Sequence, residues 1–323
     1  MNPLISFGIT FIVAFQSLGT WLEAPMKLFS FLGSEEFFIV FLPLVYWSVD
    51  AALGLRLGFI LLFGTGFNEI CKLAWHGARP YWVSTKVRGL ASETSFGVPS
   101  GHSQISAGFW GMVADYMHKV WVWILALVLV ALIGLSRLYL GVHFPHDVLV
   151  GWALGFLTLW AFVKFWDPVA ARVKKISFWN QIGLAFAVSL GMILIGALIV
   201  FLARSWIMPS EWITNATRDG GAAPDPLSLS GLITAAGTLF GLCIGLAWMM
   251  PRGGFSASGP VVKRALRFLV GLVGVAILYI GLKYIFPDGD ALVPYIFRYV
   301  RYTLLGFWVT GGAIWIFGKL QLV

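Results

Sequence analysis

The 323-residue chain has little charge: 11% of its residues are Asp, Glu, Lys or Arg, against about 25% in an average soluble domain. Hydrophobic residues make up 59% of the chain. This composition excludes an ordinary soluble globular protein and predicts a polytopic membrane protein. Cysteine is also scarce. Cys71 and Cys243 lie in separate apolar segments, which excludes a disulfide framework and gives no metal-ligand spacing.

The chain also lacks a basic stripe along any one segment. Its formal net charge is +8, but the basic residues fall at the ends of apolar runs and in three short motifs. We therefore expect membrane lipids, not nucleic acid, as surroundings and partners. No basic region precedes the first apolar run, and no small-residue cleavage site follows it, so we expect no removed signal peptide.

Nine apolar runs are long enough to cross a bilayer, which takes about 20 residues. They lie near residues 37–54, 56–75, 102–118, 121–139, 147–165, 180–203, 228–250, 266–285 and 302–320. Residues 4–22 are a further candidate, but polar residues interrupt them, and we favour an interfacial helix there. The sequence thus predicts an all-α, polytopic transmembrane helix bundle with about nine spans.

Two dense basic clusters set the orientation, because cytoplasmic loops are enriched in Lys and Arg. The clusters are Lys164, Arg172, Lys174 and Lys175, and then Arg252, Lys263, Arg264 and Arg267. Alternating the spans puts both on one side, which we predict to be cytoplasmic. The three polar motifs then fall together on the opposite, extracytoplasmic face, although they were not used to set the topology.

Three short motifs in the first half of the chain bring together three cations, two histidines and one carboxylate. They are Lys72-x6-Arg79-Pro80, Pro99-Ser100-Gly101-His102 and Ser136-Arg137-x5-His143-x3-Asp147. Charged groups in a membrane protein mark a functional site by default, because lipid penalises them. Three cations together with two imidazoles indicate a phosphate that is held, attacked and released.

Residue chemistry supports this interpretation motif by motif. Pro80 favours extended backbone at Arg79 and an end to the preceding helix, and a guanidinium can bind two phosphate oxygens while Lys72 acts as a point charge. Ser100 fits a helix N-cap, and Gly101 lets a ligand approach the N–H groups of that helix N-terminus.

His143 and Asp147 are four residues apart and so share a helix face. The carboxylate can hold Nδ1–H of the imidazole and leave Nε2 free to attack. Each motif alone could instead be an interfacial cation, an ordinary capped helix or an Asp favoured by the helix dipole. These alternatives become weak because all three motifs would have to arise together on one face.

The remaining polar groups near the motifs receive structural interpretations. We assign His76, His118 and His146 structural roles, and we expect His146 to point to a different helix face from His143. Glu69 lies about one turn before Lys72 and is expected to pair with a neighbouring cation.

These motifs resemble those of the type 2 phosphatidic acid phosphatase superfamily, which shares its fold with vanadium haloperoxidases. The resemblance covers roughly residues 36–165. It implies that His143 is the nucleophile forming a phosphohistidine, that Asp147 orients it, and that His102 is the general acid. It also implies that no metal and no cofactor is needed. The implied phosphate-binding residues are Lys72, Arg79, Ser100, Gly101 and Arg137.

The predicted organisation is an N-terminal segment (1–35), the catalytic core (36–170) and additional transmembrane helices (171–323). The nine-span layout also resembles glucose-6-phosphatases, but these have Gln where this chain has Asp147, the residue found in lipid phosphatases. We predict a metal-independent phosphatase for lipid phosphates or (poly)prenyl (di)phosphates, in a bacterial cytoplasmic membrane with its active site facing the periplasm or exterior.

Three alternatives stay open at this point. The first is a sugar phosphatase of the glucose-6-phosphatase type, and the second is a phosphotransferase of the same superfamily. The third, a transporter or scaffold with a vestigial site, is disfavoured because the last three predicted spans are nearly uncharged.

Overall fold

The computed structural model describes residues 2–218 and 220–323, and these two ranges contain helices and turns but no strand. Within them, seven helical segments are long and apolar enough to cross a membrane, or eight if a bent N-terminal pair counts as one span. The prediction of an all-α membrane protein is confirmed, and about nine spans agrees approximately. The run near 102–118 forms a helix of only 17 residues, Gly101–Met117.

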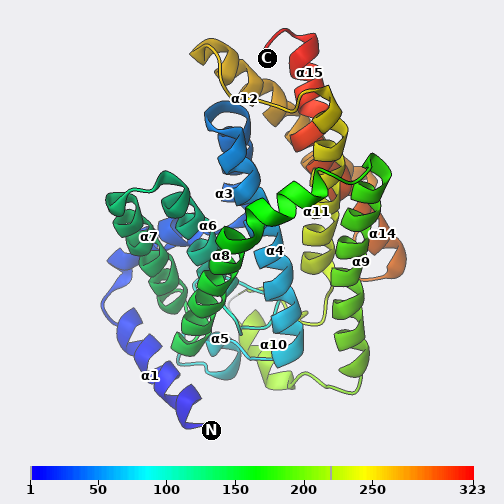
Figure 1. The fold of residues 1–323 in the computed structure, drawn as a ribbon. Helices are drawn as coiled ribbons and strands as arrows, with labels where there is room; N and C mark the ends of the chain where they lie inside the picture. Colours follow the sequence, from blue (N-terminus) through cyan, green and yellow to red (C-terminus); the bar gives the residue numbers. More distant parts are fainter. Residues whose placement is uncertain (1, 219) are drawn as a thin grey trace. The chain divides into compact units, whose positions relative to one another are not determined.

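Figure 1 shows the helices in chain order. The α-helices are α1 (Pro3–Gln16), α2 (Glu23–Phe31), α3 (Glu35–Leu44), α4 (Ala51–Trp75), α5 (Pro80–Val83), α6 (Gly101–Met117), α7 (Val120–Tyr139), α8 (Pro145–Val173), α9 (Phe178–Leu202), α10 (Ser210–Thr217), α11 (Ser230–Met249), α12 (Val261–Ala276), α13 (Leu282–Ile285), α14 (Leu292–Phe307) and α15 (Ala313–Lys319). Short 3₁₀ segments are η1 (Thr20–Leu22) and η3 (Met250–Arg252), and π-helical segments are η2 (Val45–Val49), η4 (Ile277–Gly281) and η5 (Trp308–Gly312).

The chain divides into two compact units whose boundaries fall inside α3, α4, α8 and α9 and between α10 and α11. Unit 1 comprises Met1–Phe37, Phe67–Trp160 and Leu198–Ser228, and unit 2 comprises Phe38–Gly66, Ala161–Ala197 and Leu229–Val323. All three motifs belong to unit 1. The predicted division at residues 35 and 170 follows the sequence and stays a prediction.

Unit 1 is built around α7, which packs against both α2 and α6. Its core is rich in aromatic side chains, among them the fully buried Trp82, Phe96 and Phe144. Glycine lets α8 approach α6 closely, because a Cβ at Gly155 would lie 2.3 Å from the carbonyl oxygen of Gln104. This close approach brings the start of α8 next to the start of α6, where two of the motifs lie.

The N-terminal run is not one helix. Helix α1 ends at Gln16, and the segment Thr20–Phe31 continues at 91° to it. The break falls at Gly19, whose φ of +115° is in a region that favours glycine. The run predicted near 4–22 is therefore wrong as a single helix, and an interfacial position for it stays a prediction.

Unit 2 is dominated by the packing of α11 against α14. Glycines on α11 allow this contact: a Cβ at Gly241 would lie 1.9 Å from the carbonyl oxygen of Thr303. Helix α14 begins at Leu292, well before the predicted span start at 302, so Arg301 falls inside it. The apolar pattern located the helix but placed its first residue too late.

Candidate active site

Hydrogen bonds bring the three motifs together within unit 1. Arg79 Nη1 of the first motif donates to the Val142 carbonyl oxygen, which lies inside the third. The Ser100 N–H donates to the Asp147 carbonyl oxygen at 3.0 Å, and the His143 N–H donates to that of Arg137 at 3.4 Å. The predicted site residues are thereby gathered in the interior of unit 1. Lys72, Arg79, Ser100, Arg137, His143 and Asp147 are buried, while Gly101 and His102 are partly buried.

The imidazole of His143 has a polar partner at each nitrogen. Its Nδ1 lies 3.3 Å from Asp147 Oδ2, which also accepts from the Phe144 N–H at 2.8 Å. Its Nε2 lies 3.2 Å from Arg79 Nη1. Because the Arg79 guanidinium can only donate, Nε2 accepts from it, and the proton of the neutral ring lies on Nδ1, which faces Asp147. The spacing of four residues places these groups as predicted.

His143 lies in the loop between α7 and α8 and is only 1% exposed. Burial lowers the pKa of His143 well below its usual value, and the positive charges of Arg79 and Arg137 lower it further. A lowered pKa keeps the imidazole neutral at physiological pH. Neutral imidazole has the free lone pair that a nucleophile needs.

The start of α6 has the predicted cap. Ser100 Oγ accepts hydrogen bonds from the N–H and the Oγ–H of Ser103, at 3.4 and 3.0 Å. A Cβ at Gly101 would lie 3.1 Å from Asn68 Oδ1 and 3.8 Å from Lys72 Nζ. The glycine therefore brings the N-terminus of α6 next to the lysine of the first motif, so that both can face one anion.

All five N–H donors of Arg79 have acceptors in this structure. Nε donates to the Ser95 carbonyl oxygen at 2.6 Å, and Nη1 donates to the Val142 carbonyl oxygen at 3.0 Å as well as facing His143. Nη2 donates to Ser95 Oγ and to the Phe96 carbonyl oxygen, each at 3.1 Å. Arg79 thus fastens the loop of residues 84–99 to His143, a contact that its motif did not indicate.

The local backbone around Arg79 differs from the prediction. Helix α4 already ends at Trp75, where His76 takes a positive φ of 52°. Pro80 does not end that helix but opens the short helix α5, a position that suits its fixed φ. Arg79 itself is extended, as expected before a proline.

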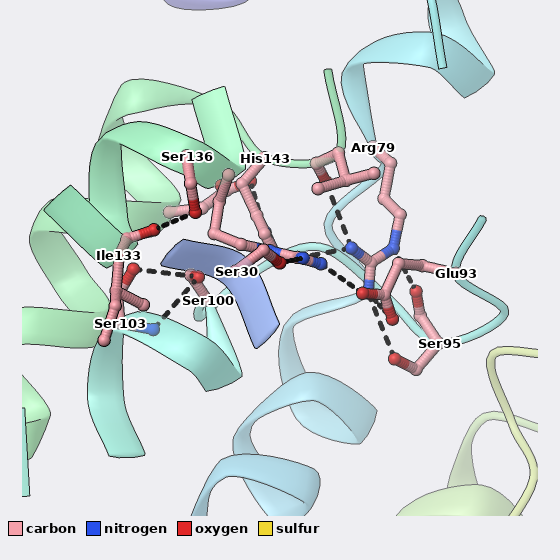
Figure 2. Close-up of polar contacts among 12 residues, drawn as sticks. Ser30, Arg79, Glu93, Ser95, Ser100, Ser103, Ile133, Ser136 and His143 are labelled. Atoms are coloured by element: carbon pink, nitrogen blue, oxygen red, sulfur yellow. Dashed lines mark hydrogen bonds and ion pairs between the residues drawn. The ribbon is translucent and has the colours of Figure 1, made fainter. Parts of the chain in front are cut away.

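Glu93 is the main site residue that the sequence analysis missed. Its carboxylate forms a very short ion pair with Arg137 Nη2 and lies 3.7 Å from Arg79 Nη2. Figure 2 shows it beside the Arg79 guanidinium, opposite His143. One signal could have found it, since it is the single carboxylate between Glu69 and Asp115.

The ionisation of Glu93 follows from its neighbours. Burial by itself would raise the pKa of Glu93, but the charges of Arg79 and Arg137 outweigh it and hold the pKa below its usual value. The carboxylate is therefore negative at physiological pH. It supplies a full negative charge between the guanidinium groups of Arg79 and Arg137.

Two serines also belong to the site and carried no sequence signal. Ser30 of α2 accepts a hydrogen bond from Arg137 Nη1 at 2.5 Å. Ser95 Oγ lies 3.0 Å from Lys72 Nζ, which is also 3.4 Å from Glu69. The predicted pairing of Glu69 with a neighbouring cation agrees with this geometry.

His146 lies beside Asp147. Its Nε2 is 3.1 Å from Asp147 Oδ1, although the two atoms are not aligned as a hydrogen bond, and its ring stacks on Phe144. The expectation that it points to a different helix face from His143, and its structural role, stay predictions. His102, the predicted acid, lies beside Gly33, and its role stays a prediction.

The family model "PAP2 superfamily" matches residues 53–170, and "PAP2 superfamily phosphatase, transmembrane extension" matches residues 233–323. Phosphatidylglycerophosphatase B of Bacillus subtilis (strain 168) is 32% identical over 170 residues, which cover 48% of this chain and 80% of that protein. This chain belongs to the PAP2 superfamily. The resemblance read from the motifs is confirmed, and the protein is a membrane phosphatase.

Other PAP2 relatives match more of the chain at lower identity. Glucose-6-phosphatase 3 of Bos taurus is 26% identical over 270 residues, covering 69% of this chain and 75% of the relative. The crystal structure of a transmembrane PAP2 type phosphatidylglycerolphosphate phosphatase from Bacillus subtilis matches with 28% identity and a TM-score of 0.45, covering 52% of this chain and 89% of that one. PAP2 proteins similar to this one therefore include both lipid and sugar phosphatases.

Proposed function

We propose that this PAP2 phosphatase hydrolyses a lipid phosphate or (poly)prenyl (di)phosphate through a phosphohistidine intermediate, on the extracytoplasmic face of a bacterial cytoplasmic membrane. The observation that carries the mechanism is the position of His143 between Asp147 and Arg79. Nε2 has a lone pair, Asp147 stabilises the imidazolium that forms, and cations lie where a phosphoryl group would be attacked.

The reaction runs in two transfers. His143 Nε2 attacks phosphorus, the bond to the leaving oxygen breaks, and His102 donates a proton to that oxygen. Water then attacks the phosphohistidine, His102 takes a proton from it, and the P–N bond breaks to release inorganic phosphate. Lys72, Arg137 and the N–H groups at the start of α6 stabilise the negative charge that develops on the phosphoryl oxygens.

Three features support a lipid phosphate as substrate. Asp147 is the residue that lipid phosphatases carry at this position, and the relative from Bacillus subtilis is named for a lipid phosphate. A site on a membrane face also meets lipid headgroups directly.

The proposed orientation in the membrane is supported by the basic clusters at 164–175 and 252–267, which favour the cytoplasmic side.

Sugar phosphate hydrolysis is the second candidate. It is favoured by the glucose-6-phosphatase matches, which extend over 67–76% of the chain, whereas the lipid phosphatase match covers 48%. The two candidates share the chemistry at His143 and differ in the group attached to phosphorus. A phosphotransferase would differ only in the acceptor of the second step.

One screen separates these candidates. Phosphate release is measured with phosphatidate, phosphatidylglycerophosphate, polyprenyl phosphate, polyprenyl diphosphate and glucose 6-phosphate, in detergent and with EDTA. We expect release from a lipid phosphate in the presence of EDTA, and a loss of at least about 10⁴-fold in His143→Ala. Turnover of glucose 6-phosphate alone would favour the second candidate.

The intermediate itself can be trapped. Rapid acid-free denaturation after mixing with ³²P-labelled substrate should leave label on the protein that is stable to alkali and lost in acid, as a P–N bond is. His143→Ala should carry no label. Labelled protein that resists acid, or strict dependence on a divalent metal, would overturn the mechanism.

A further inference from the structure

Arg137 and Arg79 face the same internal anion. Glu93 contacts both guanidinium groups, and no other carboxylate lies within ion-pair distance of either one in the part of the chain that the structure describes. A phosphoryl group entering beside His143 would need these same donors. The carboxylate of Glu93 therefore stands where an anionic ligand would bind.

The two arginines differ in how many of their N–H donors already have acceptors within the protein. Arg79 uses all five N–H groups on protein acceptors. Arg137 is buried, donates to Ser30 and Glu93, and its Nε has no acceptor among the described residues. A buried guanidinium N–H without a partner is costly. An incoming anion would therefore gain more binding energy from Arg137 than from Arg79. To bind Arg137, it has to compete with the carboxylate of Glu93.

Glu93 can leave this position while Arg137 cannot. The Glu93 side chain is 27% exposed, and that of Arg137 only 3%. The backbone of Glu93 is fixed, because its N–H donates to Tyr81 Oη and its carbonyl oxygen accepts from the same hydroxyl, each at 3.0 Å. Rotation of the Glu93 side chain toward solvent therefore frees Arg137 without opening the loop.

We propose that Glu93 is a specificity-determining residue: its carboxylate competes with every anionic ligand for Arg137, so that doubly charged phosphate monoesters bind and singly charged phosphodiesters do not. This inference rests on the proposed function, because it takes Arg137 as a phosphate-binding residue.

The charge of the ligand decides the outcome. A phosphate monoester carries about −1.5 to −2 at pH 7, whereas a diester carries a single negative charge. When a diester displaces the Glu93 carboxylate from Arg137, one negative charge replaces another, and little electrostatic energy is gained. Exchanging the carboxylate for a monoester adds negative charge beside the cations. The competition lowers the affinity of the site for every anion, and the affinity for a diester becomes too low for it to bind.

Discrimination against diesters matters for a phosphate site at a membrane face. A cluster of cations beside a bilayer would otherwise be occupied by diester lipid headgroups, which are abundant there. The same competition would help inorganic phosphate to leave after the second transfer, because Glu93 recovers Arg137 as the product departs.

The test is direct anion binding to a protein that cannot form the intermediate. Inorganic phosphate and dimethyl phosphate are titrated calorimetrically into His143→Ala and His143→Ala/Glu93→Gln in detergent at one pH. We expect the added Glu93→Gln to lower both dissociation constants by about tenfold or more, as loss of a competing charged hydrogen bond implies. Dimethyl phosphate binding should become measurable.

Two controls make the result decisive. Glu23→Gln removes the same charge at an exposed pair with Lys27 and should leave both dissociation constants unchanged. Should Glu93→Gln fail to fold, Glu93→Asp, which retracts the carboxylate by one methylene, should tighten phosphate binding to a smaller extent.

Weaker or unchanged phosphate binding in the Glu93 variants would overturn the inference, since it would mean that Glu93 only holds Arg137 in place. Failure of the phosphohistidine proposal is a separate result. It would appear as missing label on wild-type protein, whereas the binding comparison uses variants without His143.

Discussion

The two units bury charge in opposite ways. In unit 1, Arg79 and Arg137 share the carboxylate of Glu93, and Arg79 also contacts His143. In unit 2, Arg267 is fully buried and donates to the carbonyl oxygens of residues 256–258, with no carboxylate among the described residues paired with it. Backbone carbonyls cannot be exchanged for a ligand without loss of structure. A paired carboxylate can, and this difference separates a binding site from a structural anchor.

The same contrast appears in the glycines. In unit 1, Gly101 brings a helix N-terminus near Lys72, and Gly141, with φ of +74°, turns the chain two residues before His143. In unit 2, Gly241 lets α11 touch the backbone of α14. At these positions glycine brings chemical groups together in the first unit and two helices together in the second.

The largest effect should come from Asp147→Asn in unit 1. The amide no longer stabilises an imidazolium at His143, so we expect kcat to fall roughly 10³-fold while the protein stays folded. Asp167→Asn in unit 2 is the matched control, because its pair with Arg56 is exposed and should matter little. Equal activity of the two variants would contradict the assigned role of Asp147.

Gly241→Ala should produce the converse result. Its Cβ would overlap the Thr303 carbonyl oxygen, so we expect a loss of about 1–3 kcal/mol in stability, read as a lower melting temperature, with activity per folded molecule unchanged. Gly191→Ala on α9 is the control, since no described atom outside its own helix backbone lies within 4 Å of its Cβ. Equal melting temperatures would contradict the close packing of α11 and α14.

Ser30→Ala tests the support of Arg137. Loss of the acceptor on Nη1 should cost roughly 1 kcal/mol of transition-state binding, or about fivefold in kcat/KM. Ser48→Ala in unit 2 removes a serine bonded to the Arg264 carbonyl oxygen and should leave kcat/KM unchanged. If both variants behaved alike, Ser30 would have no special role.

The smallest effect concerns pH. Burial first, and then nearby cations, lower the pKa of His143 in the folded state, so below about pH 6.5 the unfolded chain binds a proton there that the folded chain does not. Wild-type stability should therefore fall relative to His143→Gln as pH drops from 7 to 5. Melting curves at both values check this; a constant difference between the two proteins would exclude a lowered pKa.

The sequence predicted the parts of the fold and site that depend on short-range rules. The spacing of His143 and Asp147 predicts one shared face, Ser100 is the N-cap of α6, and the apolar runs located the membrane helices. Helix starts were less certain, as at Leu292, because a helix extends beyond its apolar stretch when polar residues find partners.

The rest depends on contacts between distant residues. Ser30 meets Arg137 across 107 positions, and Glu93 meets it across 44. A serine or a lone loop carboxylate has no local signature, because its partner is set by the packing of other elements.

For this protein, the sequence by itself determined the family, the membrane setting and the histidine, carboxylate and cations of the three motifs, since these follow from hydropathy and from residue types at fixed spacing. Tertiary structure alone decided that acceptors in the loop of residues 84–99 bind the Arg79 guanidinium and that Glu93 forms an ion pair with Arg137. Hydrogen-bond donors are shared out only when the chain has folded, because buried polar groups take whichever acceptors the packing provides.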